Sequence, residues 1–196
     1  MNTTGPAHTP RAARPAIFLD RDGTINEDLH YLHEPEKVIL CPGAGGGLQL
    51  LRRAGYALIV VTNQSGVGRG YFPLEDVHAV NDRLSELLKP WGVEILAYYI
   101  APEKPEEPSF GRKPKPDFLF QARDRFGLSL KDSFFIGDKK VDLETGWNAG
   151  LRESILVRTG KGAREEERDP ALAQRAHICD NLGEAARYIL SLGPVT

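Results

Sequence analysis

Residues 17–24 read IFLDRDGT. An apolar run ends in two carboxylates two positions apart, Asp20 and Asp22, and a glycine and a threonine then turn the chain. This pattern predicts a buried strand that delivers both acids to the carboxyl edge of a parallel sheet, where ligands bind in open α/β folds. Residues two apart share one side of an extended backbone, so both carboxylates can face one ligand. Taken in isolation, the stretch is as typical of a solvated strand end as of a functional site, because Asp and Gly are common turn residues.

The same arrangement, an apolar strand followed by polar residues, recurs further along the chain. The predicted strands are 57–61, followed by TNQS and a glycine-bearing loop at 66–70; 94–100, followed by a proline-rich loop at 101–116; and 133–137, followed by Asp138 and Lys139. Segments with apolar residues at helical spacing separate these strands. The predicted helices are 43–55, 73–90, 117–127, 141–149 and 183–192, and one further strand is predicted at 154–157.

The alternation of strands and helices predicts an α/β fold of three layers, in which helices cover both faces of a doubly wound, mostly parallel sheet. A single domain is expected over residues 15–196, because no repeat and no second core is visible. Residues 1–14 are rich in Pro, Ala, Thr and Arg and are expected to form a flexible arm. The charge run at 164–169 is expected to lie in a solvated loop.

Composition limits the classes of partner. The chain has 196 residues with 25 basic and 27 acidic side chains, which leaves a net charge of -2 and no general attraction to nucleic acid or acidic membranes. No apolar run approaches the roughly 20 residues that cross a bilayer, and the N-terminal residues lack the apolar centre of a secretion signal, so we expect a cytoplasmic protein. Cys41 and Cys179 lie far apart and are expected to be buried, free residues.

In a doubly wound sheet, the ends of the predicted strands meet at one edge. Several carboxylates would then lie beside a hydroxyl, an amide and a lysine, in a set formed by Asp20, Asp22, Thr62, Asn63, Lys113, Asp138 and Asp142. Carboxylates that repel one another at neutral pH require a divalent cation, and oxygen ligands favour Mg²⁺ over zinc. A lysine and a hydroxyl beside that metal suit phosphate. His30 and His33 could also bind a metal, but such residues are more often surface hydrogen-bonding groups.

Four motifs in this order resemble the haloacid dehalogenase superfamily of phosphatases. They are DRDGT at 20–24, TN at 62–63, RKP at 112–114, and GDK at 137–139 with the later Asp142. Longer strings resemble one branch, the D-glycero-D-manno-heptose 1,7-bisphosphate phosphatases and the related histidinol-phosphate phosphatases. These strings are Asp28 with Tyr31, TNQSG through Arg69-Gly70, and VRTGK at 157–161. The resemblance covers roughly residues 15–192 and implies no large cap domain.

The resemblance implies a role for each matching residue of the catalytic set. Asp20 would be the nucleophile that forms an aspartyl-phosphate, and Asp22 would protonate the leaving alcohol and later deprotonate water. Asp20, the backbone carbonyl of Asp22, and Asp138 would bind Mg²⁺. Thr62 and Lys113 would bind the phosphoryl oxygens.

Without a cap, loops would frame the substrate. The residues expected to bind it are Arg21, Asp28, Tyr31, Asn63, Gln64, Ser65, Arg69, Arg112 and Lys139. Arg112 is the strongest candidate for binding a second phosphate, because a guanidinium can form two parallel hydrogen bonds. Asp142 would act from behind this set, by orienting Lys113 or the waters on the metal.

One departure from the branch's pattern concerns zinc. Many members carry a zinc-binding loop with Cys-x-His and then Cys-x-Cys just before Arg-Lys-Pro. Here the comparable positions read APE at 101–103 and SFG at 109–111, so neither a thiol nor an imidazole is present to bind zinc in that way. The sequence therefore predicts Mg²⁺ as the cofactor and no structural zinc.

The expected activity is Mg²⁺-dependent phosphomonoester hydrolysis, with a heptose 1,7-bisphosphate of nucleotide-activated heptose biosynthesis as the favoured substrate. Histidinol phosphate is the alternative, because single motifs do not separate the two activities. A phosphate-binding module without catalysis is disfavoured because every catalytic position is filled, and a nucleic-acid 3′-phosphatase is disfavoured by the neutral charge. We expect a monomer whose partner is a small phosphorylated sugar, with no nucleic acid or membrane partner.

Overall fold

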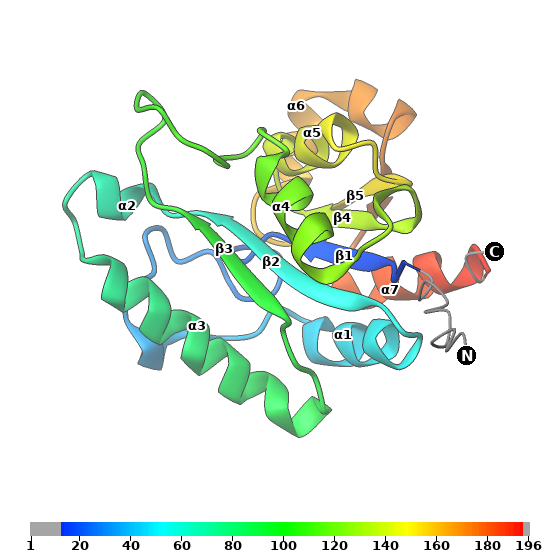
Figure 1. The fold of residues 1–196 in the computed structure, drawn as a ribbon, viewed down its shortest axis with the longest axis horizontal. Coiled ribbons are helices and arrows are strands. Elements are labelled where there is room, and N and C mark those ends of the chain that lie inside the picture. The colour runs from blue at the N-terminus through cyan, green and yellow to red at the C-terminus, as the bar shows by residue number, and fades with distance from the viewer. Residues whose placement is uncertain (1–12, 194–196) are drawn as a thin grey trace, which may run out of the picture.

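The computed structural model describes residues 13–193, and their strands form one parallel sheet in the order β3-β2-β1-β4-β5-β6 (Figure 1). The strands are β1 (Ala16–Leu19), β2 (Ala57–Asn63), β3 (Ala97–Ala101), β4 (Phe134–Gly137), β5 (Glu153–Val157) and β6 (His177–Cys179). The central strand β1 pairs with β2 and β4, and Leu19 lies opposite Val60 on one side and Ile136 on the other. The stretch that carries Asp20 therefore ends in the middle of the sheet.

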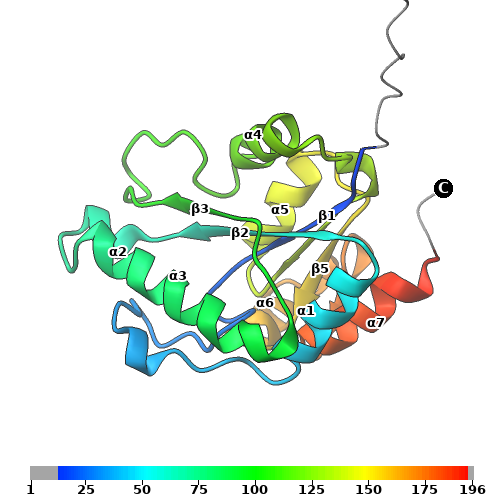
Figure 2. The same ribbon diagram turned by 60° about the horizontal axis from the view of Figure 1, so that its bottom comes forward.

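Helices cover both faces of this sheet (Figure 2). The helices α1 (Ala44–Arg53), α3 (Leu74–Leu88) and α7 (Leu182–Ser191) pack on one face, and α4 (Asp117–Phe126) and α5 (Lys140–Asn148) cover the other. Side chains alternate along β1, so Ile17 and Leu19 join the first apolar layer whereas Ala16 and Phe18 join the second. The three-layer α/β fold is confirmed, and residues 13–193 contain no separate cap domain.

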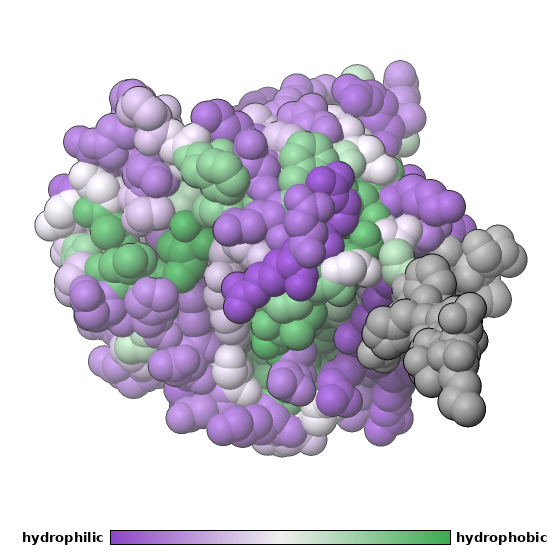
Figure 3. Space-filling view, viewed as in Figure 1, coloured by the Kyte–Doolittle hydropathy of each residue, from purple (hydrophilic) through white to green (hydrophobic). Residues whose placement is uncertain are grey.

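Most of the buried apolar side chains belong to these two layers, and a third, smaller cluster is formed by Leu143, Leu156, Leu172 and Ala176. The surface in Figure 3 is largely hydrophilic, and apolar residues reach it there in separate patches. None of the helices in the described chain combines the length and the apolar character that a membrane crossing requires.

Two predicted segments differ from the structure on the β2–β3 side. The predicted strand at 94–100 begins only at Ala97, because residues 93–96 carry the chain from α3 to the sheet and the first ladder pair joins Ala97 to Ile59. The glycine-bearing loop after β2 contains a single helical turn, α2 (Ser65–Gly68).

A third difference lies after β5. The predicted charged loop at 164–169 was wrong in secondary structure, because most of it belongs to helix α6 (Gly162–Arg168). Arg168 pairs with Glu165 at a distance of 2.7 Å, three residues apart, and such pairs support a short helix. Strand β6 was not predicted, because a strand of three residues is too short to show a period. The 3₁₀ segments are Pro35–Lys37, Lys89–Trp91, Leu130–Asp132 and Pro170–Gln174.

The structure also describes the last residues of the predicted N-terminal arm. Residues 1–12 of the expected arm lie outside the described residues. Arg14, which was placed in the arm, forms an isolated parallel bridge with Leu128. Its guanidinium donates to the backbone oxygens of Gly55 at 2.7 Å and Tyr56 at 2.9 Å. Arg14 therefore contacts the domain one residue before the predicted boundary at 15.

Candidate active site

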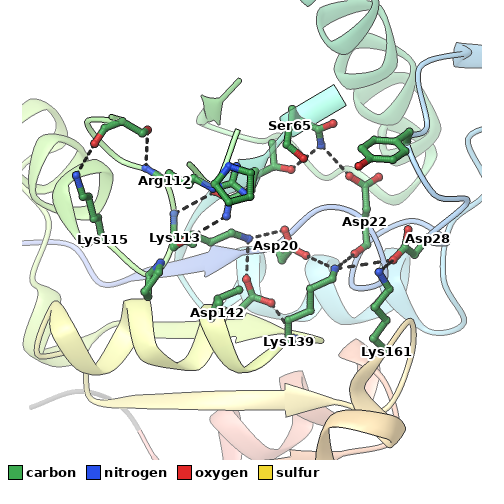
Figure 4. A pocket seen from close by; sticks show the side chains of 18 of the residues that line it. Asp20, Asp22, Asp28, Ser65, Arg112, Lys113, Lys115, Lys139, Asp142 and Lys161 are labelled. Atoms are coloured by element: carbon green, nitrogen blue, oxygen red, sulfur yellow. Dashed lines mark hydrogen bonds and ion pairs between the residues drawn. The ribbon is translucent and has the colours of Figure 1, made fainter. Parts of the chain in front are cut away.

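The polar segments that follow β1, β2 and β4 meet at the carboxyl edge of the sheet, as the doubly wound topology predicts. With parts of the loops at 24–40 and 101–116 they line a cavity of about 690 Å³ (Figure 4). The predicted site residues that line it are Asp20, Asp22, Asp28, Tyr31, Thr62, Asn63, Gln64, Ser65, Arg112, Lys113, Lys139 and Asp142. Asp138 is completely buried next to this cavity, while Arg21 and Arg69 do not line it.

Asp20 is held in a buried cluster of charges (Figure 4). Lys113 Nζ donates to Asp20 Oδ1 at 2.6 Å and lies 2.6 Å from Asp142 Oδ1. Burial opposes the ionisation of Asp20, but Lys113 and Lys139 together hold the pKa of its carboxyl well below the usual range. Burial alone would lower the pKa of Lys113, and the neighbouring Asp142 and Asp20 carboxylates raise it instead. Asp20 is therefore an ionised, oriented carboxylate, the state that nucleophilic attack requires.

Lys113 reaches this cluster on the proline-rich loop and is anchored there by β2. Asn63, the last residue of β2, accepts a hydrogen bond from the backbone N–H of Lys113 at 3.0 Å. Its Nδ2 also donates to the backbone oxygen of Lys113 at 3.2 Å. Asn63 was predicted to bind substrate; it lines the cavity, and its side-chain amide also holds the backbone of Lys113.

Three oxygens, from Asp20, Asp22 and Asp138, converge on the ammonium of Lys139. Lys139 Nζ lies 2.9 Å from Asp138 Oδ1, 3.2 Å from the backbone oxygen of Asp22 and 3.5 Å from Asp20 Oδ2. Since the resemblance assigns these same oxygens to Mg²⁺, the ammonium is a stand-in cation that shows a positive charge fits among them. Burial, reinforced by the Asp20 carboxylate, raises the pKa of Asp138 to about 8, so the cluster needs a neutralising charge. Hard oxygen donors of this kind fit Mg²⁺.

Asp138 is held in place by the backbone. Its Oδ2 accepts a hydrogen bond from the N–H of Lys161 at 2.9 Å. Gly23 and Gly160 have positive φ values of 90° and 57°, and a Cβ at either position would collide with the Asp138 carboxylate. Glycine is therefore required at both positions to leave room for this carboxylate.

Asp22 lies beside Asp20 and accepts hydrogen bonds from several side chains. Gln64 Nε2 donates to Asp22 Oδ2 at 2.8 Å, and Asn26 Nδ2 donates to Oδ1 at 2.9 Å. Gln64 Nε2 also lies 2.7 Å from Thr62 Oγ1. Gln64, which was predicted to bind substrate, therefore connects the Asp22 carboxylate to Thr62.

Arg21 departs furthest from its predicted place. It was expected to bind substrate, but its side chain is completely buried and does not line the cavity. The guanidinium donates to the Asp22 carboxylate and, through Nη1, to Asn81 Oδ1 at 2.9 Å. The physical reason is side-chain alternation, because a residue between two that face the ligand points to the other side. Arg21 therefore lies behind Asp22, where it has no access to substrate.

Arg112 lies on the wall formed by the proline-rich loop. Its Nη1 donates to the backbone oxygen of Glu103 at 2.8 Å, and its backbone N–H donates to Ser109 Oγ at 3.2 Å. Ser109 Oγ in turn donates to Glu103 Oε2 at 2.7 Å. Polar contacts thus join the two positions of the loop where the branch's pattern carries zinc ligands. Arg69, which was expected to bind substrate, does not reach this cavity.

Two lysines that the sequence did not single out as site residues also line the cavity, Lys115 and Lys161 (Figure 4). Lys161 Nζ lies 3.4 Å from Asp28 Oδ2, and Lys139 Nζ lies 3.9 Å from the same oxygen. Lys161 follows β5, so the rule that placed ligand groups at strand ends would have found it if applied to that strand as well.

Comparison with known proteins gives consistent matches over most of the chain. The HAD-hydrolase-like family model matches residues 110–185. The D-glycero-beta-D-manno-heptose-1,7-bisphosphate 7-phosphatase of Pasteurella multocida is 37% identical over 183 residues, which cover 90% of this chain and 97% of that protein. The protein of the same name from Pseudomonas putida is 36% identical over 175 residues, which cover 89% of this chain and 98% of that protein.

Solved structures agree with these matches. The D,D-heptose 1,7-bisphosphate phosphatase from B. bronchiseptica, complexed with magnesium and phosphate, has a TM-score of 0.81 and 29% sequence identity, and the match covers 91% of this chain and 99% of that chain. A putative HAD-like phosphatase from Mesorhizobium loti has a TM-score of 0.77 and 32% identity over 97% of this chain and 93% of that one. The chain therefore belongs to the D-glycero-D-manno-heptose-1,7-bisphosphate 7-phosphatase family of the haloacid dehalogenase-like hydrolases.

Proposed function

We propose that this protein is a Mg²⁺-dependent phosphatase that removes the 7-phosphate of D-glycero-D-manno-heptose 1,7-bisphosphate through an aspartyl-phosphate on Asp20. The observation that carries the proposal is the pairing of an ionised, buried Asp20 with Lys113 at 2.6 Å, with Asp22 two residues away on the cavity wall. Curated relatives are named for this reaction, and a related structure was solved in complex with magnesium and phosphate.

The geometry suggests a role for each reacting group. The Asp20 carboxylate attacks phosphorus, and Asp22 gives a proton to the departing sugar oxygen. Asp22 then removes a proton from the water that hydrolyses the aspartyl-phosphate. Lys113 and the Thr62 hydroxyl bind the phosphoryl oxygens as negative charge redistributes. Mg²⁺, held by Asp20, Asp138 and the backbone oxygen of Asp22, would neutralise charge between carboxylate and phosphate.

The charge of the cavity wall supports a bisphosphate over histidinol phosphate. Beyond the groups next to Asp20, the wall carries three cations, Arg112, Lys115 and Lys161, and two acids, Asp28 and Glu107, so cations are in excess. A second phosphate gains from these cations, whereas the amine of histidinol phosphate is repelled by them.

A substrate panel with and without metal tests the proposal. We expect heptose 1,7-bisphosphate to have a higher kcat/KM than fructose 1,6-bisphosphate and histidinol phosphate when phosphate release is measured. We also expect EDTA to abolish turnover, added Mg²⁺ to restore it, and elemental analysis to find no stoichiometric zinc. Faster hydrolysis of histidinol phosphate would transfer the assignment to that activity, and full activity in EDTA would contradict the metal requirement.

Arg112→Ala tests how the second phosphate is bound. We expect kcat/KM on the sugar bisphosphate to fall by a factor that corresponds to a loss of about 2 to 4 kcal/mol of transition-state stabilisation. This is the range for truncating one partner of a desolvated charge pair. A small monophosphate such as p-nitrophenyl phosphate should be hydrolysed almost as before, because it has no second phosphate.

Arg69→Ala is the matched control for Arg112→Ala. This arginine was also predicted to bind substrate but does not line the cavity, so its removal should leave both substrates nearly unaffected. An equal loss on both substrates in Arg112→Ala would place Arg112 at the reacting phosphate instead.

A further inference from the structure

Arg21 is among the largest completely buried side chains of the described residues, and it is a cation. Burying a charge is costly unless it is paired and hydrogen-bonded, so its contacts indicate its purpose. Arg21 Nη2 donates to Asp22 Oδ2 at 2.9 Å, and Nε lies 3.2 Å from each of the two Asp22 oxygens. The guanidinium thus contacts both carboxylate oxygens of Asp22 from the buried side.

Asn81 holds the other edge of the same guanidinium. It lies on α3 among the residues that face the core, with Val80 and Leu84 beside it, and is itself buried. Asn81 Oδ1 accepts a hydrogen bond from Arg21 Nη1 at 2.9 Å, while its Nδ2 has no hydrogen-bond partner among the described residues. A buried amide with one orphaned group destabilises the fold, so stability alone does not account for an asparagine here.

The backbone around Arg21 is equally constrained. Its carbonyl oxygen accepts hydrogen bonds from the N–H groups of Thr24 at 3.3 Å, Ile25 at 2.9 Å and Asn26 at 3.2 Å. The turn that carries Asp22 is therefore closed around Arg21, while Asp22 itself still reaches the cavity. The result is a chain of contacts from helix α3 through Asn81 and Arg21 to the acid beside the nucleophile.

We infer that Arg21 and Asn81 are positioning residues for Asp22, which hold its carboxylate where it exchanges a proton with the leaving oxygen. The inference rests on the proposed function, because it assumes that Asp22 is the general acid and base. If the Asp22 carboxylate is misaligned, proton transfer to the leaving group slows. A step that needs no proton transfer is not affected.

The leaving group separates this role from a structural one. In single-turnover experiments, release of p-nitrophenolate needs no proton, whereas release of the sugar alcohol does. For Asn81→Leu and Arg21→Lys we expect sugar release to slow by about ten- to a hundredfold, a partial loss of the 10²–10⁴-fold that general acid–base catalysis contributes. Release of p-nitrophenolate in the first turnover should change little. Circular dichroism and thermal melting establish that each variant is folded.

Ser85→Ala is the matched control on the same helix. The Ser85 hydroxyl lies one turn beyond Asn81 and donates to the Asn81 backbone oxygen, not to Arg21, so both leaving groups should depart at the unmutated rate. If Asn81→Leu and Arg21→Lys slow both substrates equally, or neither, the positioning role is overturned while the phosphatase assignment stands. If the unmutated protein releases neither leaving group, the proposed function fails and the inference falls with it.

Discussion

Replacing Asp20 with asparagine is expected to abolish turnover and leave the fold intact. The amide cannot form the aspartyl-phosphate, and we expect activity to fall by about 10³-fold or more, as for other catalytic nucleophiles. The fold should tolerate the change because Asp20, Asp138 and Asp142 place three carboxylates beside two ammonium groups, Lys113 and Lys139. Without the Asp20 carboxylate each ammonium keeps a buried carboxylate partner, Asp142 for Lys113 and Asp138 for Lys139.

Phosphate release from a sugar bisphosphate and a thermal melt measure both halves of this prediction. Asp22→Asn is the informative comparison, since it should still form phosphoenzyme from an aryl phosphate, whose phenolate departs without a proton. Trapped phosphoenzyme in Asp20→Asn, or activity above about one per cent of the unmutated level, would show that another residue is the nucleophile.

The second large effect is expected for Lys113→Met, and it concerns stability as well as activity. The substitution keeps the length of the side chain but leaves Asp20 and Asp142 buried without the ammonium between them. Breaking a buried ion pair by removing one partner costs about 3 to 5 kcal/mol, so the free energy of unfolding should fall by that amount. Activity should fall as well, because the phosphoryl oxygens lose a charged donor.

Urea unfolding without added metal measures this stability. The double variant Lys113→Met/Asp142→Asn removes one of the two carboxylates that Lys113→Met leaves unpaired. It should recover part of the lost stability without recovering turnover. Lys115→Met serves as the matched control, because Lys115 donates to the Ser109 backbone oxygen near the surface and its loss should change stability little. A Lys113→Met protein as stable as the unmutated one would contradict the buried charge cluster.

Much of the architecture could be predicted because the signals for it are local. Strand β1 is too apolar to face water on either side, and the glycine and threonine after Asp22 turn the chain where the strand must stop. The alternation of strands and helices then restricts the topology to a few parallel arrangements, all of which bring the strand ends together. Hence Asp20, Asp22 and Thr62 could be assigned to one site before any distance was known.

Short elements were not predictable in this way. Strand β6 spans only His177–Cys179. It forms because it pairs with β5 in the sheet, with Cys179 opposite Val157. Helix α6 consists largely of charged residues and lacks an apolar stripe, so its sequence resembles a loop. Strand β6 depends on a partner strand outside its own segment, which no local pattern records.

What the sequence determined by itself was the fold class and the identity of the groups at the sheet edge, because hydrophobic period and turn chemistry are properties of the chain. Only the tertiary structure decided what each polar side chain contacts. Arg21 turns inward to Asp22 and Asn81, Asn63 binds the backbone of Lys113, and Arg69 stays outside the cavity. These outcomes depend on the direction of a side chain and on groups distant in the sequence. A hydrogen bond requires a donor and an acceptor about 3 Å apart, and residue type and spacing in the sequence do not specify such distances.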